Sequence, residues 1–156
     1  MKRSLLVLLL LLPVLVVAQD KYIELLRSNL KTERVAIITE AMELTDKESD
    51  VFWPIYRDYD HERSKLADTR IAILKDYASN YGNLTDEKAQ DIIYRSFDLE
   101  RDLLDLEEKY FVKIRRALSA KRAARFIQVE NQLNMLIQMQ ISSELPLVPK
   151  PSSVEK

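Results

Sequence analysis

His61, the only histidine, is the side chain best suited to metal or proton chemistry in this chain of 156 residues. Acidic neighbours Asp58, Asp60 and Glu62 could help it to bind Zn²⁺ or Ni²⁺, most simply across a dimer. A surface histidine that titrates near neutral pH explains the same pattern, and we favour that interpretation. His61 is thus a weak candidate ligand, and the sequence predicts neither a metal site nor a cofactor.

Met135 and Met139 lie one helical turn apart and form a second candidate site. Two thioethers suit Cu(I), which prefers soft ligands. Methionine at helical spacing also fills gaps in hydrophobic cores. We therefore expect both residues to pack in the core.

Three absences restrict the possible chemistry. The chain has no Cys, one Gly and one His. These counts exclude a disulfide framework, a thiol nucleophile, zinc–thiolate and iron–sulfur sites, sites that need two imidazoles of one chain, and glycine-rich phosphate loops. Carboxylate pairs occur on every predicted helix, but none has a credible nucleophile or oxyanion donor beside it. The sequence predicts that the protein is not an enzyme.

The N-terminus has the layout of a secretory signal peptide. Lys2 and Arg3 precede an apolar run over residues 5–17, and polar sequence begins after Ala18. The run is shorter than the roughly 20 residues that span a bilayer. We expect residues 1–18 to be cleaved, which predicts a periplasmic protein without stable membrane insertion.

Charge gives no argument for nucleic-acid binding. Losing two basic residues with the signal peptide changes the formal net charge from −1 to −3. The absence of Cys also excludes a Cys-acylated lipoprotein.

Composition and three N-terminal caps predict an all-α fold. A single Gly among many Leu, Ala, Glu, Lys and Arg residues favours helices. Thr45, with Glu48 three residues later, forms a capping box and begins a helix over 46–80. The other two predicted caps are Thr85, which begins a helix over 86–117, and Ser119, which begins a last helix.

The two long helices must form an antiparallel hairpin, because only a short turn joins them. We expect Gly82 to end the first in a left-handed conformation. Residues 22–43 also have a helical period, with a break near 29–32. The predicted domain, over 19–145, is thus a four-helix fold in which N- and C-terminal helices flank a long hairpin, followed by a disordered tail over 146–156.

Aromatic residues gather near the start of the first long helix. Phe52, Tyr56 and Tyr59 share one face, and Trp53 lies beside them. They could form an adhesive surface for unfolded client proteins. Aromatic residues at helical spacing more often form core, and we favour core packing.

Arg63 and Arg70 lie seven residues apart on the same apolar stripe. Buried without partners they would be costly. We expect them to pair with acids of the facing helix, with Asp98 and Asp102 as candidates, or else to line an open groove that binds clients.

The second long helix is acidic in its middle and basic near its end. This layout could hold an antiparallel partner or a client of mixed charge. A solvated face with weak ion pairs within the helix explains the same layout, and we favour that interpretation. The acids and bases, in order, are Asp98, Glu100, Asp102, Asp105, Glu107 and Glu108, then Lys113, Arg115 and Arg116.

Several segments give the chain a family resemblance. Leu-Thr occurs at residues 44–45 and 84–85, Phe-Trp-Pro-Ile-Tyr at 52–56, and Ala-Arg-Phe-Ile-Gln-Val-Glu-Asn-Gln-Leu at 124–133. Over about residues 31–148 the chain resembles the Spy/CpxP group of periplasmic helical proteins, known for LTxxQ motifs. Glu48 and Lys88 stand where that motif has Gln.

The resemblance implies a curved four-helix protein, often a dimer. Better-known members of the group are ATP-independent chaperones or act in envelope-stress signalling, and others bind metals. We therefore expect an exported protein that holds unfolded or envelope proteins on an amphipathic helical surface, with homodimerisation open. Two alternatives are a metal-responsive sensor or scavenger and a structural protein that docks on one envelope partner.

Overall fold

The computed structural model describes residues 33–150. The expected signal peptide over 1–18, the helix up to residue 32 with its break near 29–32, and tail residues 151–156 lie outside the described residues. The chain divides into two units between Glu43 and Leu44. In the first unit, residues 33–42 are helical.

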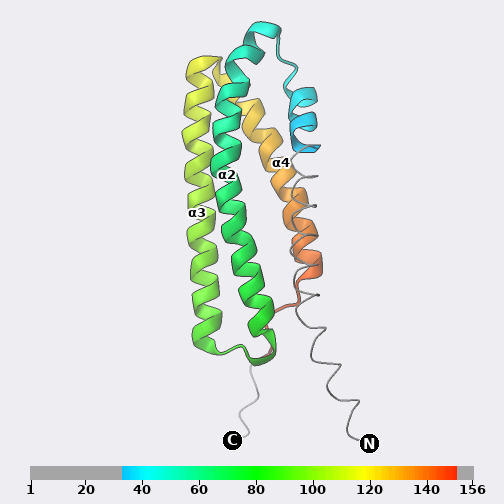
Figure 1. Cartoon of the computed structure of the whole chain (residues 1–156), viewed down its shortest axis with the longest axis vertical. Helices are drawn as coiled ribbons and strands as arrows, with labels where there is room; N and C mark the ends of the chain where they lie inside the picture. The colour runs from blue at the N-terminus through cyan, green and yellow to red at the C-terminus, as the bar shows by residue number, and fades with distance from the viewer. Residues whose placement is uncertain (1–32, 151–156) are drawn as a thin grey trace, which may run out of the picture. The chain divides into compact units, whose positions relative to one another are not determined.

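The second unit contains three long helices, shown in Figure 1. They are α2 (Asp46–Asn80), α3 (Asp86–Ala117) and α4 (Ala120–Glu144). With the helix over 33–42 they make four α-helices, and the described residues contain no strand. The predicted all-α class and the bounds of the two longest helices are confirmed. None of the helices within residues 33–150 is long and apolar enough to cross a membrane.

Each of the three predicted caps is present. The Thr45 hydroxyl accepts a hydrogen bond from the Glu48 amide at 3.4 Å, and the Glu48 carboxylate accepts one from the Thr45 amide at 2.9 Å. Thr85 accepts from the Lys88 amide at 3.2 Å, and Ser119 accepts from the Arg122 amide at 3.1 Å. These bonds satisfy amide groups that the first turn of a helix leaves without partners.

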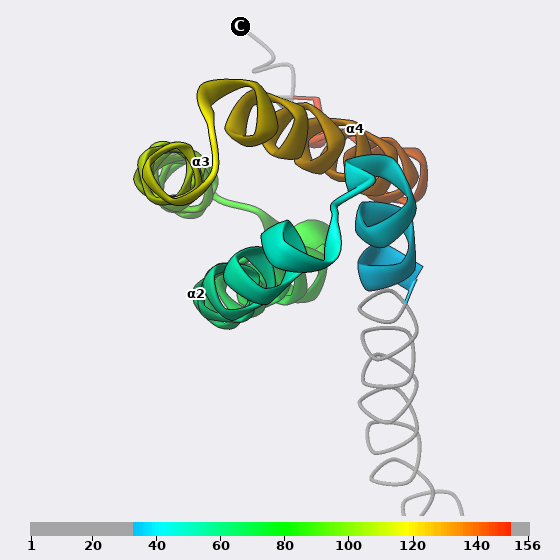
Figure 2. The same cartoon turned by 90° about the horizontal axis from the view of Figure 1, so that it is seen from above.

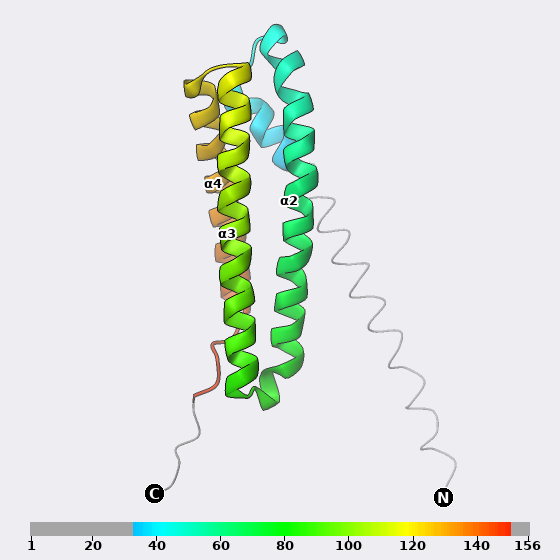
Figure 3. The ribbon, with the colours of Figure 1, turned by 90° about the vertical axis from the view of Figure 1, so that its left-hand side faces the viewer.

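Helices α2 and α3 form the predicted antiparallel hairpin, seen from the side in Figure 3. The prediction for its turn was wrong, since Gly82 has no positive φ. The chain instead continues from α2 into a short 3₁₀ helix over Tyr81–Asn83 and leaves it in an extended conformation at Leu84. A right-handed 3₁₀ turn needs no left-handed residue. The Asn80 side chain caps the end of α2 by donating to the Asp76 carbonyl at 2.8 Å.

Helix α4 packs against both helices of the hairpin, and the second unit has two main groups of core residues. Near the start of α2 lies an aromatic cluster, which we define as Phe52, Tyr56, Tyr59, Tyr110 and Phe126. The Phe126 ring of α4 lies 5.7 Å from Phe52 and 5.2 Å from Tyr59.

The second core group lies near the hairpin turn and is aliphatic with one buried tyrosine. Its buried members are Ile73, Tyr77, Ile92 and Leu99. The hydroxyl of Tyr77 donates to the Pro146 carbonyl at 2.9 Å. The first residue of the predicted tail is therefore held against α2.

Candidate functional site

The four aromatic residues that the sequence offers as candidate client contacts belong mostly to the core. Phe52, Tyr56 and Tyr59 are buried, and Trp53 is half-buried with its ring 5.2 Å from that of Phe52. Tyr59 also donates a hydrogen bond to the buried carboxylate of Glu130 at 2.9 Å. The preferred core interpretation is therefore confirmed for the three buried rings, and they present no free surface to a client.

Arg63 and Arg70 form ion pairs, but with different acids from those predicted. Arg63 pairs with Asp60 of its own helix at 3.0 Å, and Arg70 pairs with Glu100 of α3 at 3.0 Å. Asp98 and Asp102 were the wrong candidates. They lie two residues from Glu100, which on a helix turns them to the opposite side. Asp98 instead pairs with Arg101 on the surface.

His61 is exposed on α2. Within residues 33–150 there is no group of three or more His, Cys, Asp or Glu side chains arranged to hold a metal ion.

The prediction that Met135 and Met139 pack in the core was wrong. Their exposed fractions are 63% and 64%, and that of the neighbouring Leu136 is 64%. The cause is that α4 buries only a narrow face, formed in its first half by Ala123, Phe126, Val129 and Glu130. We call Met135, Leu136 and Met139 the methionine face.

A second exposed group runs along α3. Phe97 and Leu104 are 53% and 60% exposed, and the half-buried Phe111 continues their line at the same spacing of seven residues. We call these three residues the outer stripe. Figure 2 looks along α3 and shows α2 and α4 on one side of it. Leu104 and Phe111 also line a shallow hollow of about 330 Å³ that Ile127 of α4 helps to form.

Besides Arg70–Glu100, three ion-pair sites tie the described helices together, and none of them was predicted from the sequence. The first joins α4 to α2, where Arg122 donates to both carboxylate oxygens of Glu48 at 2.8 and 2.9 Å. The Arg122 hydrogen bonds, with those from Thr45, lower the pKa of Glu48 to about 2. The cap and the ion pair thus share one carboxylate.

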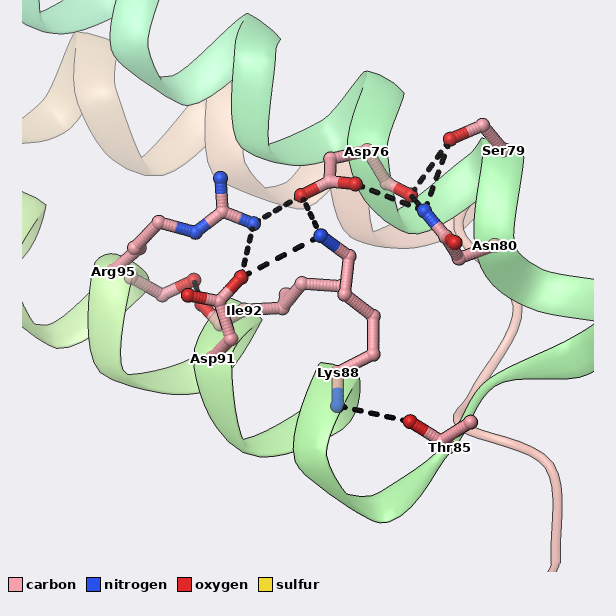
Figure 4. A network of polar contacts seen from close by, with 9 residues as sticks. Asp76, Ser79, Asn80, Thr85, Lys88, Asp91, Ile92 and Arg95 are labelled. Atoms are coloured by element: carbon pink, nitrogen blue, oxygen red, sulfur yellow. Dashed lines mark hydrogen bonds and ion pairs between the residues drawn. The ribbon is translucent and has the colours of Figure 1, made fainter.

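The second ion-pair site lies beside the hairpin turn (Figure 4). Asp76 of α2 accepts from Lys88 of α3 at 2.7 Å and also from Arg95. Asp91 completes the group by contacting Arg95 at 3.0 Å. The Lys88 and Arg95 hydrogen bonds lower the pKa of Asp76. Two acids therefore balance two bases, and the group's evident role is to hold the start of α3 against the end of α2.

A third set of polar contacts borders the aromatic cluster. Glu62 of α2 accepts from Lys109 at 2.7 Å and from the Tyr110 hydroxyl at 2.9 Å. The Lys109 hydrogen bond is the main cause of a lowered pKa at Glu62. Burial and the Glu62 hydrogen bond raise the pKa of Tyr110. These contacts join α2 to α3 beside the aromatic cluster.

Exposed apolar side chains are therefore the features of the second unit that its own packing leaves unused. The sequence carried a signal for the outer stripe, because Phe97, Leu104 and Phe111 repeat at seven residues beside the buried stripe of Ile92, Leu99 and Leu106. Two apolar stripes on one helix predict two contact faces.

No family model matches the chain, and neither a curated protein nor a solved structure matches it.

Proposed function

We propose that the protein is an exported binding protein that holds unfolded or partly folded clients without ATP, as a chaperone or stress adaptor. The methionine face carries this proposal. Three large apolar side chains that are more than 60% exposed cluster within about one helical turn of α4. Methionine side chains are flexible and polarisable, so they adapt to apolar surfaces of different shape.

The surroundings of the methionine face suit loose recognition. From Ile127 to Glu144, the only charged residues of α4 are the buried Glu130 and the terminal Glu144. An uncharged apolar surface attracts exposed apolar segments with little regard to their sequence. The resemblance to the Spy/CpxP group and the signal-peptide layout of residues 1–18 support the same proposal.

An aggregation assay tests the proposal. Purified mature protein should suppress light scattering from an unrelated unfolding client at about equimolar ratio. The variant Met135→Ser/Leu136→Ser/Met139→Ser should lose most of that effect, because it removes the apolar contact area. Leu147→Ser/Val148→Ser is the matched control, since both residues are exposed apolar residues outside α4.

Failure of the wild-type protein to suppress aggregation over a wide range of ratios would contradict the proposal. Crosslinking in intact cells distinguishes it from its nearest alternative. A holding chaperone gives many crosslinked species, whereas a structural protein that docks on one envelope partner gives one dominant species.

A further inference from the structure

The outer stripe of α3 differs from the methionine face in its charge. Acidic residues border it on both sides from Phe97 to Glu108, as helical spacing places them, and the Arg115 guanidinium lies 6.0 Å from the Phe111 ring at its other end. Asp98 and Asp105 each follow a stripe residue by one position and lie with Glu108 on one side, while Glu100 and Glu107 lie on the other. From Ile93 to Val112, α3 carries six acids and three bases.

Two of these acids are available for new contacts. Asp105 and Glu108 are exposed, and neither forms an ion pair with any described residue. Glu100 already pairs with Arg70, and Asp98 pairs with Arg101. Glu108 also lines the shallow hollow with Leu104 and Phe111. Apolar contact area and unused negative charge therefore meet at one place on the surface.

The acidic residues beside the outer stripe determine which kind of partner can bind there. A second copy of the chain docked through the same stripe would bring acidic borders against acidic borders, and like charges across an interface are unfavourable. An acidic client meets the same repulsion. A segment that alternates apolar and basic residues satisfies both properties, because its apolar side chains cover the rings while its Lys or Arg side chains reach the carboxylates.

We infer that the outer stripe binds cationic amphipathic segments of client proteins, with Phe97, Leu104 and Phe111 as the apolar contacts and Asp105 and Glu108 as the charge-selecting residues. This inference rests on the proposed function and assigns it a class of client. The methionine face then binds apolar segments irrespective of charge, and the outer stripe adds a preference for basic ones.

Three fluorescent peptides test the inference. They share their apolar residues at helical spacing and carry Lys, Gln or Glu at every polar position. Fluorescence anisotropy with the full mature protein should give Kd values in the order Lys, Gln, Glu, with the Lys peptide binding about threefold to tenfold tighter than the Gln peptide at low ionic strength. Raising the salt to about 1 M, where the Debye length is about 3 Å, should abolish this ratio.

Two charge variants of equal net charge locate the effect. Asp105→Lys/Glu108→Lys should remove or reverse the preference for the Lys peptide. Asp50→Lys/Glu144→Lys should keep it, because these exposed acids lie on α2 and at the end of α4. A third variant, Phe97→Ser/Leu104→Ser/Phe111→Ser, should weaken binding of the Lys peptide at least tenfold, as expected when about three apolar side chains lose their burial.

The outcomes separate the inference from the proposed function. The inference would be overturned by equal Kd values for the three peptides, or by a Lys preference that survives Asp105→Lys/Glu108→Lys. In either case, aggregation suppression by the wild-type protein would leave the proposed function standing. A concentration-dependent dimer in sedimentation that the Phe97→Ser/Leu104→Ser/Phe111→Ser variant dissociates would assign the stripe to a second copy and also overturn it. Loss of both peptide binding and aggregation suppression would contradict the two proposals together.

Discussion

The aromatic cluster and the outer stripe consist of similar side chains at helical spacing, yet one is core and the other is surface. Phe126 is fully buried among the rings of α2, whereas Phe97 is 53% exposed on α3. The difference comes from neighbours. Helices α2, α3 and α4 all contribute rings to the cluster, while no described ring of another helix lies against the outer stripe. Helical period thus shows where apolar faces are, and packing decides which of them remain exposed.

Removing one ring from each region should reveal the difference between them most clearly, as a difference in the free energy of unfolding. Phe126→Ala should lower the free energy of unfolding by about 3–5 kcal/mol, because it leaves a cavity in a packed cluster. Phe97→Ala should change it by less than about 0.5 kcal/mol, since an exposed side chain loses little burial. Urea denaturation followed by circular dichroism measures both. Equal losses for the two variants would show that the outer stripe is packed.

Removing the hydroxyl group of a buried and of an exposed tyrosine should give a smaller difference in the free energy of unfolding. Tyr59→Phe removes the donor that contacts buried Glu130 at 2.9 Å and should cost about 1–3 kcal/mol, the penalty for leaving a buried acceptor without that bond. Tyr94→Phe is the control, because Tyr94 is exposed beside the outer stripe. The same denaturation measurement applies, and an unchanged Tyr59→Phe variant would mean that water replaces the lost donor.

The hairpin and the residues at which its helices begin were predictable from the sequence for physical reasons. Thr45, Thr85 and Ser119 mark helix starts because their hydroxyl groups cap local amides, which needs no tertiary information. A short turn between two long helices leaves only an antiparallel arrangement. The prediction for Gly82 was wrong because glycine permits a left-handed conformation without requiring one. The 3₁₀ turn over Tyr81–Asn83 ends α2 without any left-handed residue.

The surface was harder to predict, because it depends on the rotation of each helix about its own axis. Arg70 meets Glu100, not Asp98 or Asp102, because a difference of two residues turns a side chain to the other side of α3. Met135 and Met139 remain exposed because they lie on the side of α4 opposite to its buried residues. Tertiary packing, which no local pattern in the sequence encodes, decides which face of a helix meets its neighbours.

Acid should weaken the end of the molecule that holds the aromatic cluster. Because the Arg122 hydrogen bonds lower the pKa of Glu48 from 4.5 to about 2, its ionised form stabilises the folded state above pH 4.5, and this contribution is lost as the pH falls from about 4.5 to 2. Glu48→Gln should therefore show a flatter dependence of thermal stability on pH over this interval. Melting curves at several pH values measure it, with Asp50→Asn, an exposed acid of the same helix, as the control.

The smallest stability effect should come from the surface that we propose to be functional. Asp105→Lys/Glu108→Lys removes two exposed acids without ion pairs to described residues, so its free energy of unfolding should stay within about 0.5 kcal/mol of the wild type. Its preference for basic peptides should nevertheless change. A variant that loses peptide selectivity and keeps its denaturation midpoint separates recognition from folding. If the midpoint falls together with selectivity, these two carboxylates stabilise the helix, and their role in recognition is contradicted.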